Sequence, residues 1–141
     1  MRSQVEYHNL SKTLAKVSQK YLGRLVDDVK IEWMKYNLPR NGKCRRHMAW
    51  GMYFHDSKTI KIHGVLNQSW VPKFFVELVV YHELLHHVMI PTLSQRAMRA
   101  GKVEWHPELF MVAERQFKHY EKALQWEQKH MNRLFRTKVR R

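Results

Sequence analysis

The sequence has 141 residues, of which 44% are hydrophobic, so it fits a single globular domain and is not the composition of a disordered chain. The 26 basic residues outnumber the 12 acidic ones, and the resulting net charge of +14 favours a polyanionic partner, most commonly nucleic acid. The single cysteine, Cys44, excludes an internal disulfide and a cysteine-based zinc ribbon within these residues. With no signal-peptide core at the N-terminus and no uninterrupted apolar span, we expect a cytoplasmic protein without a membrane segment.

The first half of the sequence predicts one helix followed by a small sheet. Residues 6–26 carry apolar side chains at three- and four-residue steps, which is typical of an amphipathic helix. Residues 29–33, 47–54 and 59–63 have the composition and alternation of strands. Only a short turn separates the second strand from the third, so these two are expected to form a hairpin. The expected sheet is three-stranded, and either antiparallel or mixed.

A buried helix is predicted over residues 70–89. Ser69 is a candidate N-cap, Pro72 fits the first helical turn, and Pro91 is expected to end the helix. Residues 74–81 are apolar on nearly every side, as in a helix that is covered all round.

This helix carries the sequence His-Glu-Leu-Leu-His at positions 82–86. Residues four apart lie on one face of a helix, with Cβ atoms about 5–6 Å apart, so His82 and His86 can bind the same Zn²⁺. Glu83 then lies beside the metal as a general base for water, which is the arrangement of a zinc hydrolase. Burying two histidines and a glutamate without a partner is unfavourable, so a metal is favoured over histidines that are merely hydrogen-bonded.

The remainder of the chain predicts a connector over residues 90–105 and a long helix over residues 107–136, completing an α+β fold. We expect a domain of residues 1–128 and a basic C-terminal helix end and tail of residues 129–141. This tail and residues 35–46 each carry several lysines and arginines and no acidic residue. Both clusters are candidate DNA contacts, and the alternative interpretation is a solvated basic surface.

A catalytic zinc site needs a third protein ligand in addition to water. Candidates after His86 are His87, Glu104, His106, Glu108, Glu114 and His119. His87 points about 100° away from its neighbour on the helix, whereas His106 directly precedes a proline whose fixed backbone can aim its side chain. Glu114 is the alternative, because a glutamate is the third ligand in other HExxH enzymes.

Residues 79–86, followed after nineteen residues by His-Pro-Glu-Leu-Phe at 106–110, resemble the SprT-like zinc metalloprotease domain. Residues 60–66 are also similar to the strand and turn that precede the zinc helix in that family, and the likeness covers roughly residues 25–120. The resemblance implies a zincin-like minimal metalloprotease fold. It also implies that His82, His86 and His106 bind Zn²⁺ and that Glu83 is the catalytic base.

Residues 106–110, together with Tyr120 and Trp126, also show a weaker similarity to YgjP-like metallopeptidase-related proteins. Those proteins usually carry the third histidine much closer to the HExxH sequence, so the long gap favours the SprT-like family. Many members of that family add a cysteine-rich zinc ribbon, which the single cysteine here excludes within these residues.

These observations predict a zinc-dependent endopeptidase that acts on a protein or peptide. Because Spartan-type members of the family degrade proteins crosslinked to DNA, DNA is a candidate recruiting surface. Two alternatives remain open: a basic nucleic-acid-binding protein with structural zinc, and an interaction module that keeps a zincin fold without proteolysis. The oligomeric state is also open.

Two further expectations concern the substrate. Candidate donors to the reaction's oxyanion are His63, Tyr81, His87 and His119. Residues 59–63 are expected to line the cleft and to pair with an extended substrate, or else to be an ordinary sheet strand.

Overall fold

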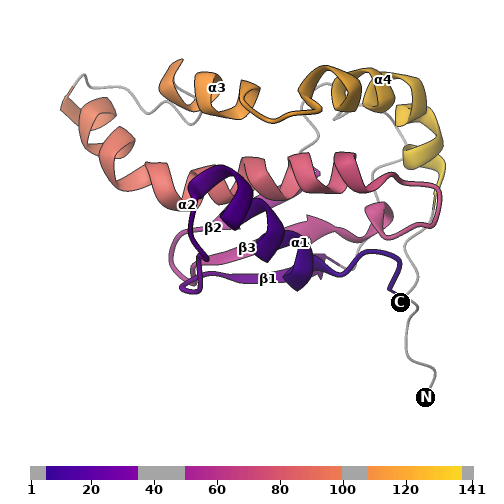
Figure 1. Ribbon diagram of the computed structural model, residues 1–141, viewed down its shortest axis with the longest axis horizontal. Helices are drawn as coiled ribbons and strands as arrows, with labels where there is room; N and C mark the ends of the chain where they lie inside the picture. The colour runs from indigo at the N-terminus through magenta and orange to yellow at the C-terminus, as the bar shows by residue number, and fades with distance from the viewer. Residues whose placement is uncertain (1–5, 35–49, 100–107, 138–141) are drawn as a thin grey trace.

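The computed structural model describes residues 6–34, 50–99 and 108–137, with side chains described for all of these except residues 90–99. The described residues form four α-helices, two short helical turns and one three-stranded sheet, which is the predicted α+β class. The long helix α2 forms a middle layer, with the sheet on one side and helices α3 and α4 on the other (Figure 1). None of the described helices has the length and apolar character needed to cross a membrane.

Helix α1 (Leu10–Val17) is shorter than the helix predicted over residues 6–26. The Asn9 side chain caps its first turn, and a π-helical turn, Ser18–Leu22, follows it directly. Gly23 then adopts a left-handed conformation with a φ of 69°, which is unstrained only because glycine has no Cβ. The helix ends there because of this glycine, so the prediction was wrong about both ends and correct about the position of the helix.

The sheet has the strand order β1-β3-β2, with β1 at Lys30–Met34, β2 at Gly51–Phe54 and β3 at Thr59–His63. Strands β2 and β3 form the predicted antiparallel hairpin, whereas β1 pairs with β3 in parallel, so the sheet is mixed. The β3 strand is therefore central, and both of its edges are occupied by neighbouring strands. The expectation that residues 59–63 pair with a substrate was wrong for this reason.

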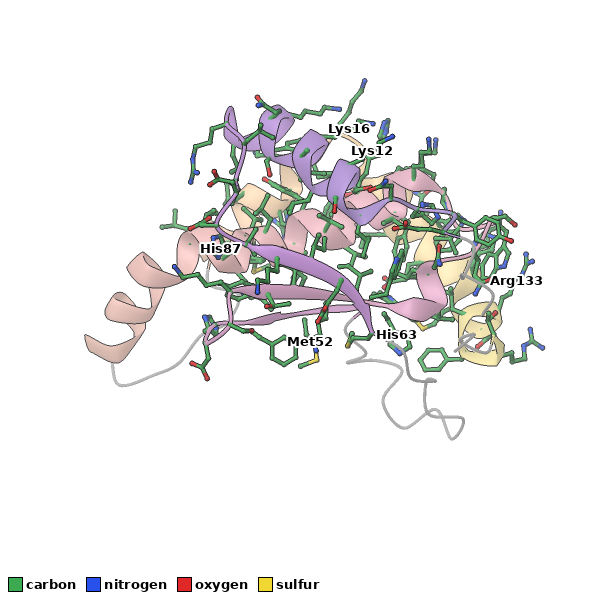
Figure 2. All side chains as sticks on the ribbon, turned by 90° about the horizontal axis from the view of Figure 1, so that it is seen from below. Lys12, Lys16, Met52, His63, His87 and Arg133 are labelled. Carbon is green, nitrogen blue, oxygen red and sulfur yellow. The ribbon has the colours of Figure 1, made fainter. Side chains whose placement is uncertain are left out.

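Helices α1 and α2 cover one face of the sheet. Ile60 and Ile62 of β3 are fully buried. Met52 and Phe54 of β2 lie on the opposite face and remain 44% and 37% exposed. Figure 2 shows Met52 pointing away from the helices, as expected for alternate residues of a strand.

Helix α2 spans Lys73–Arg99 and begins after Pro72, whose carbonyl accepts hydrogen bonds from the amides of Phe75 and Val76. Ser69 lies in the preceding turn, so it is not the N-cap. The helix also continues through Pro91, and the predicted connector is helical as far as Arg99. An interior proline costs about 3 kcal/mol, because it removes one hydrogen bond and crowds the preceding turn, but its φ is helical, so it need not end a long helix. As predicted, most of residues 74–81 are buried, and the buried apolar residues of α2 include Phe75, Val76, Leu78, Val79, Val80, Tyr81, Leu84 and Leu85.

The helix predicted over residues 107–136 is divided into α3 (Glu108–Arg115) and α4 (Tyr120–Arg136). Tight turns between them bring Phe117 into the core, where it is 3% exposed and its ring lies 5.4 Å from that of Tyr21. The single-helix prediction was wrong because burial of Phe117 favours the break, although no glycine or proline marks it. Helix α4 remains part of the packed domain up to Phe135, which is buried.

Candidate metal centre

His82, Glu83 and His86 lie together on α2, with their potential ligand atoms all within 4.8 Å of one another. Glu83 and His86 are buried, at 4% and 8% exposure, and His82 is partly buried. The rings of the two histidines are 5.0 Å apart between centroids, as their spacing along one helix requires. The three residues therefore form a compact donor group that could hold a metal ion.

Helix α3 covers this group on the side away from the sheet. Phe110 is 1% exposed, and its ring centroid lies 5.0 Å from that of His82 and 4.6 Å from that of His86. One helical turn later, the Glu114 carboxylate contacts Nδ1 of His82. This contact fixes the orientation of the imidazole, so a metal would be bound through its other nitrogen, Nε2.

The buried charges shift one another's protonation. Burial raises the pKa of Glu83 to about 7, and the nearby Glu114 charge acts in the same direction, whereas His82 opposes it. For His82, burial lowers the pKa, but the hydrogen bond to Glu114 and the charges of both glutamates raise it above its ordinary value overall. The two glutamates therefore favour positive charge at His82, which is also where a cation held by the donor group would lie.

Strand β2 reaches this site through Gly51. A Cβ atom on Gly51 would lie 3.1 Å from Cγ of Glu83, and also 3.1 Å from side-chain atoms of Ile62 and Val79. The absence of a side chain thus allows β2 to pass close to the side chain of Glu83.

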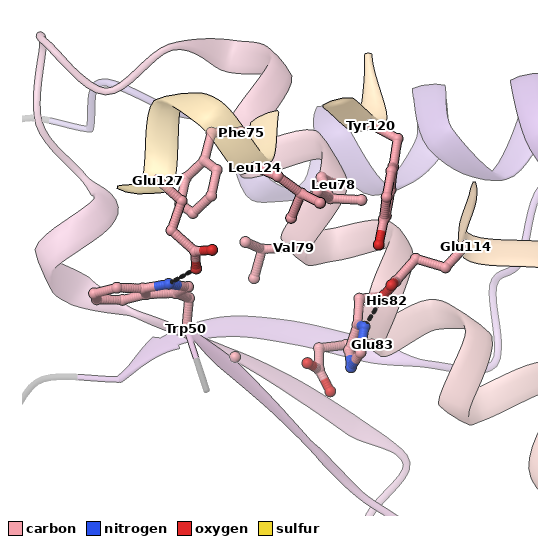
Figure 3. A pocket seen from close by; sticks show the side chains of 11 residues that line it. Trp50, Phe75, Leu78, Val79, His82, Glu83, Glu114, Tyr120, Leu124 and Glu127 are labelled. Atoms are coloured by element: carbon pink, nitrogen blue, oxygen red, sulfur yellow. Dashed lines mark hydrogen bonds and ion pairs between the residues drawn. The ribbon is translucent and has the colours of Figure 1, made fainter. Parts of the chain in front are cut away.

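A pocket of about 220 Å³ opens beside the donor group, between α2 and α4. Figure 3 shows His82, Glu83 and Glu114 at one end of it and Trp50 with Glu127 at the other, joined by a hydrogen bond from Nε1 of Trp50 to the carboxylate. Its walls are mainly apolar. The lining residues are Trp50, Gly51, Phe75, Leu78, Val79, His82, Glu83, Glu114, Tyr120, Leu124 and Glu127.

The predicted third ligands have different placements. His106 and Glu104 lie outside the described residues. Glu108 is exposed at the start of α3, and Glu114 contacts His82 without belonging to the compact donor group. His119 packs against Phe74 and Phe117, with ring centroids 6.3 Å and 6.5 Å away.

The remaining candidate, His87, is engaged on the sheet side of α2. One ring nitrogen lies 2.6 Å from the Tyr53 hydroxyl and the other 2.9 Å from the Asp28 carboxylate. His63, a candidate oxyanion donor, lies at the opposite end of the sheet from His87 (Figure 2). Both histidines therefore have local contacts away from the pocket.

None of the four predicted oxyanion donors is among the residues that line this pocket in the described part of the chain. Tyr81 donates its hydroxyl proton to the Ala113 carbonyl, 2.7 Å away. Tyr120 does line the pocket, with its hydroxyl directed toward His82 and Glu114 (Figure 3). No sequence pattern distinguishes Tyr120 from its neighbour His119, because the turn before α4 decides which of the two faces the pocket.

The basic cluster at residues 35–46 lies outside the described residues. Of the C-terminal cluster, Lys129, Arg133 and Arg136 are placed on α4. The Arg133 guanidinium lies 3.9 Å from the centroid of the Trp70 ring, which stacks on Trp126 at 6.1 Å. The end of α4 therefore combines positive charge with aromatic rings at the surface.

Comparisons with family models, with curated proteins and with solved structures find no match. The function of the chain therefore has to be inferred from its own residues.

Proposed function

We propose that the protein is a zinc-dependent endopeptidase with a zincin-like fold, in which Glu83 is the general base. The observation that carries this proposal is the grouping of His82, Glu83 and His86 within 4.8 Å on one buried helix, at the end of an open pocket. A structural zinc site is usually closed by four protein ligands, whereas an HExxH site keeps one position for water.

The donors present fit zinc, because imidazole nitrogens are among its preferred ligands. The carboxylate of Glu114 on His82 is the kind of contact that metal-bound histidines nearly always make. His82, His86 and His106 would hold the ion, with Glu114 as the alternative third ligand. A bound zinc would lower the pKa of its water to about 7 and would polarise the carbonyl of the substrate.

The protein's own groups then have separate tasks. Glu83 accepts a proton from the attacking water and passes it to the leaving amine, and its position beneath Gly51 holds it next to the substrate chain. The Tyr120 hydroxyl donates a hydrogen bond to the oxyanion of the tetrahedral intermediate. Strand β2 lies at the edge of the sheet among the described residues, so an extended peptide can pair with it.

Zinc analysis and peptide hydrolysis test this proposal together. We expect one zinc per chain in the wild type, loss of most of it in His106→Ala, and metal-dependent cleavage of casein that disappears in Glu83→Gln. Glu121→Gln, an exposed change of the same kind on α4, is the matched control and should keep full activity. Absence of zinc from the zinc-supplemented wild type would overturn the proposal, whereas full zinc in His106→Ala would make Glu114 the third ligand.

A second function is favoured by the surface of α4, where Arg133 stacks on Trp70 beside Trp126. Cations and aromatic rings together are the usual elements of nucleic-acid-binding surfaces. DNA would then recruit the peptidase to DNA-associated proteins. A basic binding module that does not cleave proteins is the alternative if no hydrolysis is found.

A further inference from the structure

We infer that the pocket beside Glu83 binds a lysine or arginine side chain of the substrate, next to the bond that is cleaved. Glu127 is the residue that selects it. This inference rests on the proposed peptidase function, and it adds the chemical class of the substrate residue.

The position of the pocket ties it to the cleaved bond. The pocket begins at His82 and Glu83 and runs between α2 and α4 to Trp50 and Glu127 (Figure 3). A peptide carbonyl held at the donor group would therefore direct an adjacent side chain into it. The volume of about 220 Å³ is below the 300–1,000 Å³ typical of pockets for whole ligands, so it suits one side chain.

The middle of the pocket is apolar. Leu78 and Val79 of α2 face Leu124 of α4 there, with Phe75 nearby (Figure 3). The methylene stem of a lysine or arginine can pack against such walls while its charged end continues beyond them.

The charge of the pocket is opposite to that of the whole protein. Among the residues that the structure describes, Glu83, Glu114 and Glu127 line it and no lysine or arginine does, although the chain has 26 basic and 12 acidic residues. Glu83 and Glu114 belong to the metal centre. Glu127 stands apart at the far end of the pocket, where the hydrogen bond from Trp50 fixes its carboxylate. A carboxylate accepts several hydrogen bonds, so Glu127 can also bind a cationic side chain.

Other side chains fit this arrangement less well. An acidic side chain that filled the pocket would be repelled by the Glu127 carboxylate at its far end. A purely apolar side chain would fill the middle but would desolvate Glu127 without giving it a partner. A long side chain with a terminal positive charge satisfies both the apolar walls and the carboxylate.

Cleavage of paired peptides tests the selection. The peptides differ only in having lysine or uncharged norleucine at one position beside the bond, which is first located by mapping casein cleavage sites. We expect the wild type to prefer lysine in kcat/KM by about tenfold or more, and Glu127→Gln to lower kcat/KM for the lysine peptide to about the value for the norleucine peptide. Glutamine still accepts the Trp50 hydrogen bond, and Glu121→Gln should leave the preference unchanged. Equal preference in the wild type and Glu127→Gln would overturn the inference.

A binding measurement separates this inference from the proposed function. In zinc-loaded Glu83→Gln, titration with Nα-acetyl-lysine N-methylamide, whose side-chain amine is free, should shift the NMR resonance of the Trp50 indole N–H. That resonance is assigned by its absence from the spectrum of Trp50→Phe. The corresponding norleucine compound should shift this resonance much less. In the double variant Glu83→Gln with Glu127→Gln, the two compounds should give similar shifts. Selective binding without any peptide cleavage by the wild type would overturn only the peptidase, whereas equal shifts for both compounds would overturn the lysine pocket.

Discussion

Tyr120 is the side chain in the pocket best placed to act on the oxyanion, because its hydroxyl points toward the donor group (Figure 3). Removing one oxyanion donor typically lowers kcat by about 10²–10³. We therefore expect Tyr120→Phe to lower kcat by about that factor while KM and zinc content change little, as measured by steady-state kinetics and metal analysis. Tyr7→Phe is the control, since Tyr7 is exposed and lies outside the pocket. An unchanged kcat in Tyr120→Phe would remove Tyr120 from the mechanism.

Glu114 would support a bound metal through His82, whose Nδ1 it contacts. Losing such a supporting carboxylate usually weakens metal binding by about 10–100-fold. We expect this loss in Glu114→Gln and none in Glu108→Gln, which changes an exposed residue of the same helix. Competition with a chelating dye measures the zinc affinity. If Glu114→Gln instead loses zinc as completely as His82→Ala does, Glu114 is a ligand rather than a support.

His63 makes the stability of the fold dependent on pH. It is 1% exposed, and burial lowers its pKa to about 4 from an ordinary value of 6.5. The unfolded chain therefore binds more protons between these pH values, so the contribution of His63 is complete above pH 6.5 and is lost as the pH falls toward 4. We expect the free energy of unfolding to fall by about 2 kcal/mol between pH 7 and pH 5 from this residue.

Urea denaturation of the metal-free protein at both pH values measures this effect without interference from zinc release. His63→Gln should reduce the pH dependence, and His55→Gln, a change at an exposed histidine, should not. Burial also lowers the pKa of His8, which adds to the fall in stability, whereas the raised pKa values of Glu83 and His82 act in the opposite direction over the same pH range. The contribution of His63 is therefore the difference between the pH dependence of the wild type and that of His63→Gln. The same pH dependence in His63→Gln as in the wild type would show that His63 does not titrate as a buried group.

The secondary elements differ in how far sequence alone could specify them. The β2–β3 hairpin and the buried helix α2 were predictable, because strand alternation and apolar periodicity are local properties. The parallel pairing of β1 with β3 was not, because it joins two strands that are separated in the sequence by β2, and no local pattern sets its direction. The break before α4 likewise depends on a distant contact, that of Phe117 with Tyr21 and Tyr81.

The residues of the candidate site also differ in whether the sequence alone could identify them. Its three donors follow one another on a single helix, so their spacing was visible in the sequence. The pocket was not visible, since its end is formed by Trp50 and Glu127, which are 77 positions apart. Tyr120 was not predicted to line the pocket, because its orientation is set by the preceding turn rather than by a motif.

The approach of strand β2 to helix α2 depends on Gly51, which leads to a prediction at the level of these two elements. Gly51→Ala would place a Cβ at 3.1 Å from Cγ of Glu83 and from two core side chains, so the strand or the carboxylate must move. We expect an unfolding free energy lower by about 1–3 kcal/mol and a loss of kcat larger than the stability change explains. Gly23→Ala is the control. It introduces strain at a positive φ outside the pocket and should lower stability without lowering kcat.

Denaturant unfolding and steady-state kinetics on the two glycine variants give the comparison directly. Equal losses of activity in Gly51→Ala and Gly23→Ala would show that the activity follows global stability. Loss confined to Gly51→Ala would show that β2 positions Glu83.

The whole molecule combines an acidic pocket with a strongly basic exterior. The net charge of +14 will attract polyanions over long distances, whereas the three carboxylates of the pocket act only on what enters it. The basic exterior would then recruit the protein to a polyanion, and the acidic pocket would select a basic side chain of the substrate. A protein substrate already bound to DNA, and itself rich in lysine and arginine, would satisfy both.

The attraction of the basic exterior for DNA is measured by how the DNA affinity depends on salt concentration. We expect the wild type to bind a short DNA duplex in fluorescence anisotropy, with an affinity that falls steeply as salt rises. Neutralising two exposed α4 residues, in Lys129→Gln with Arg136→Gln, should reduce the slope of log K against log salt by about two if both contact phosphates. The same charge change on the N-terminal helical segment, in Lys12→Gln with Lys20→Gln, keeps the net charge equal and should leave the slope nearly unchanged. Equal slopes for the two double variants would mean that DNA senses only the total charge, and α4 would then have no specific role in binding it.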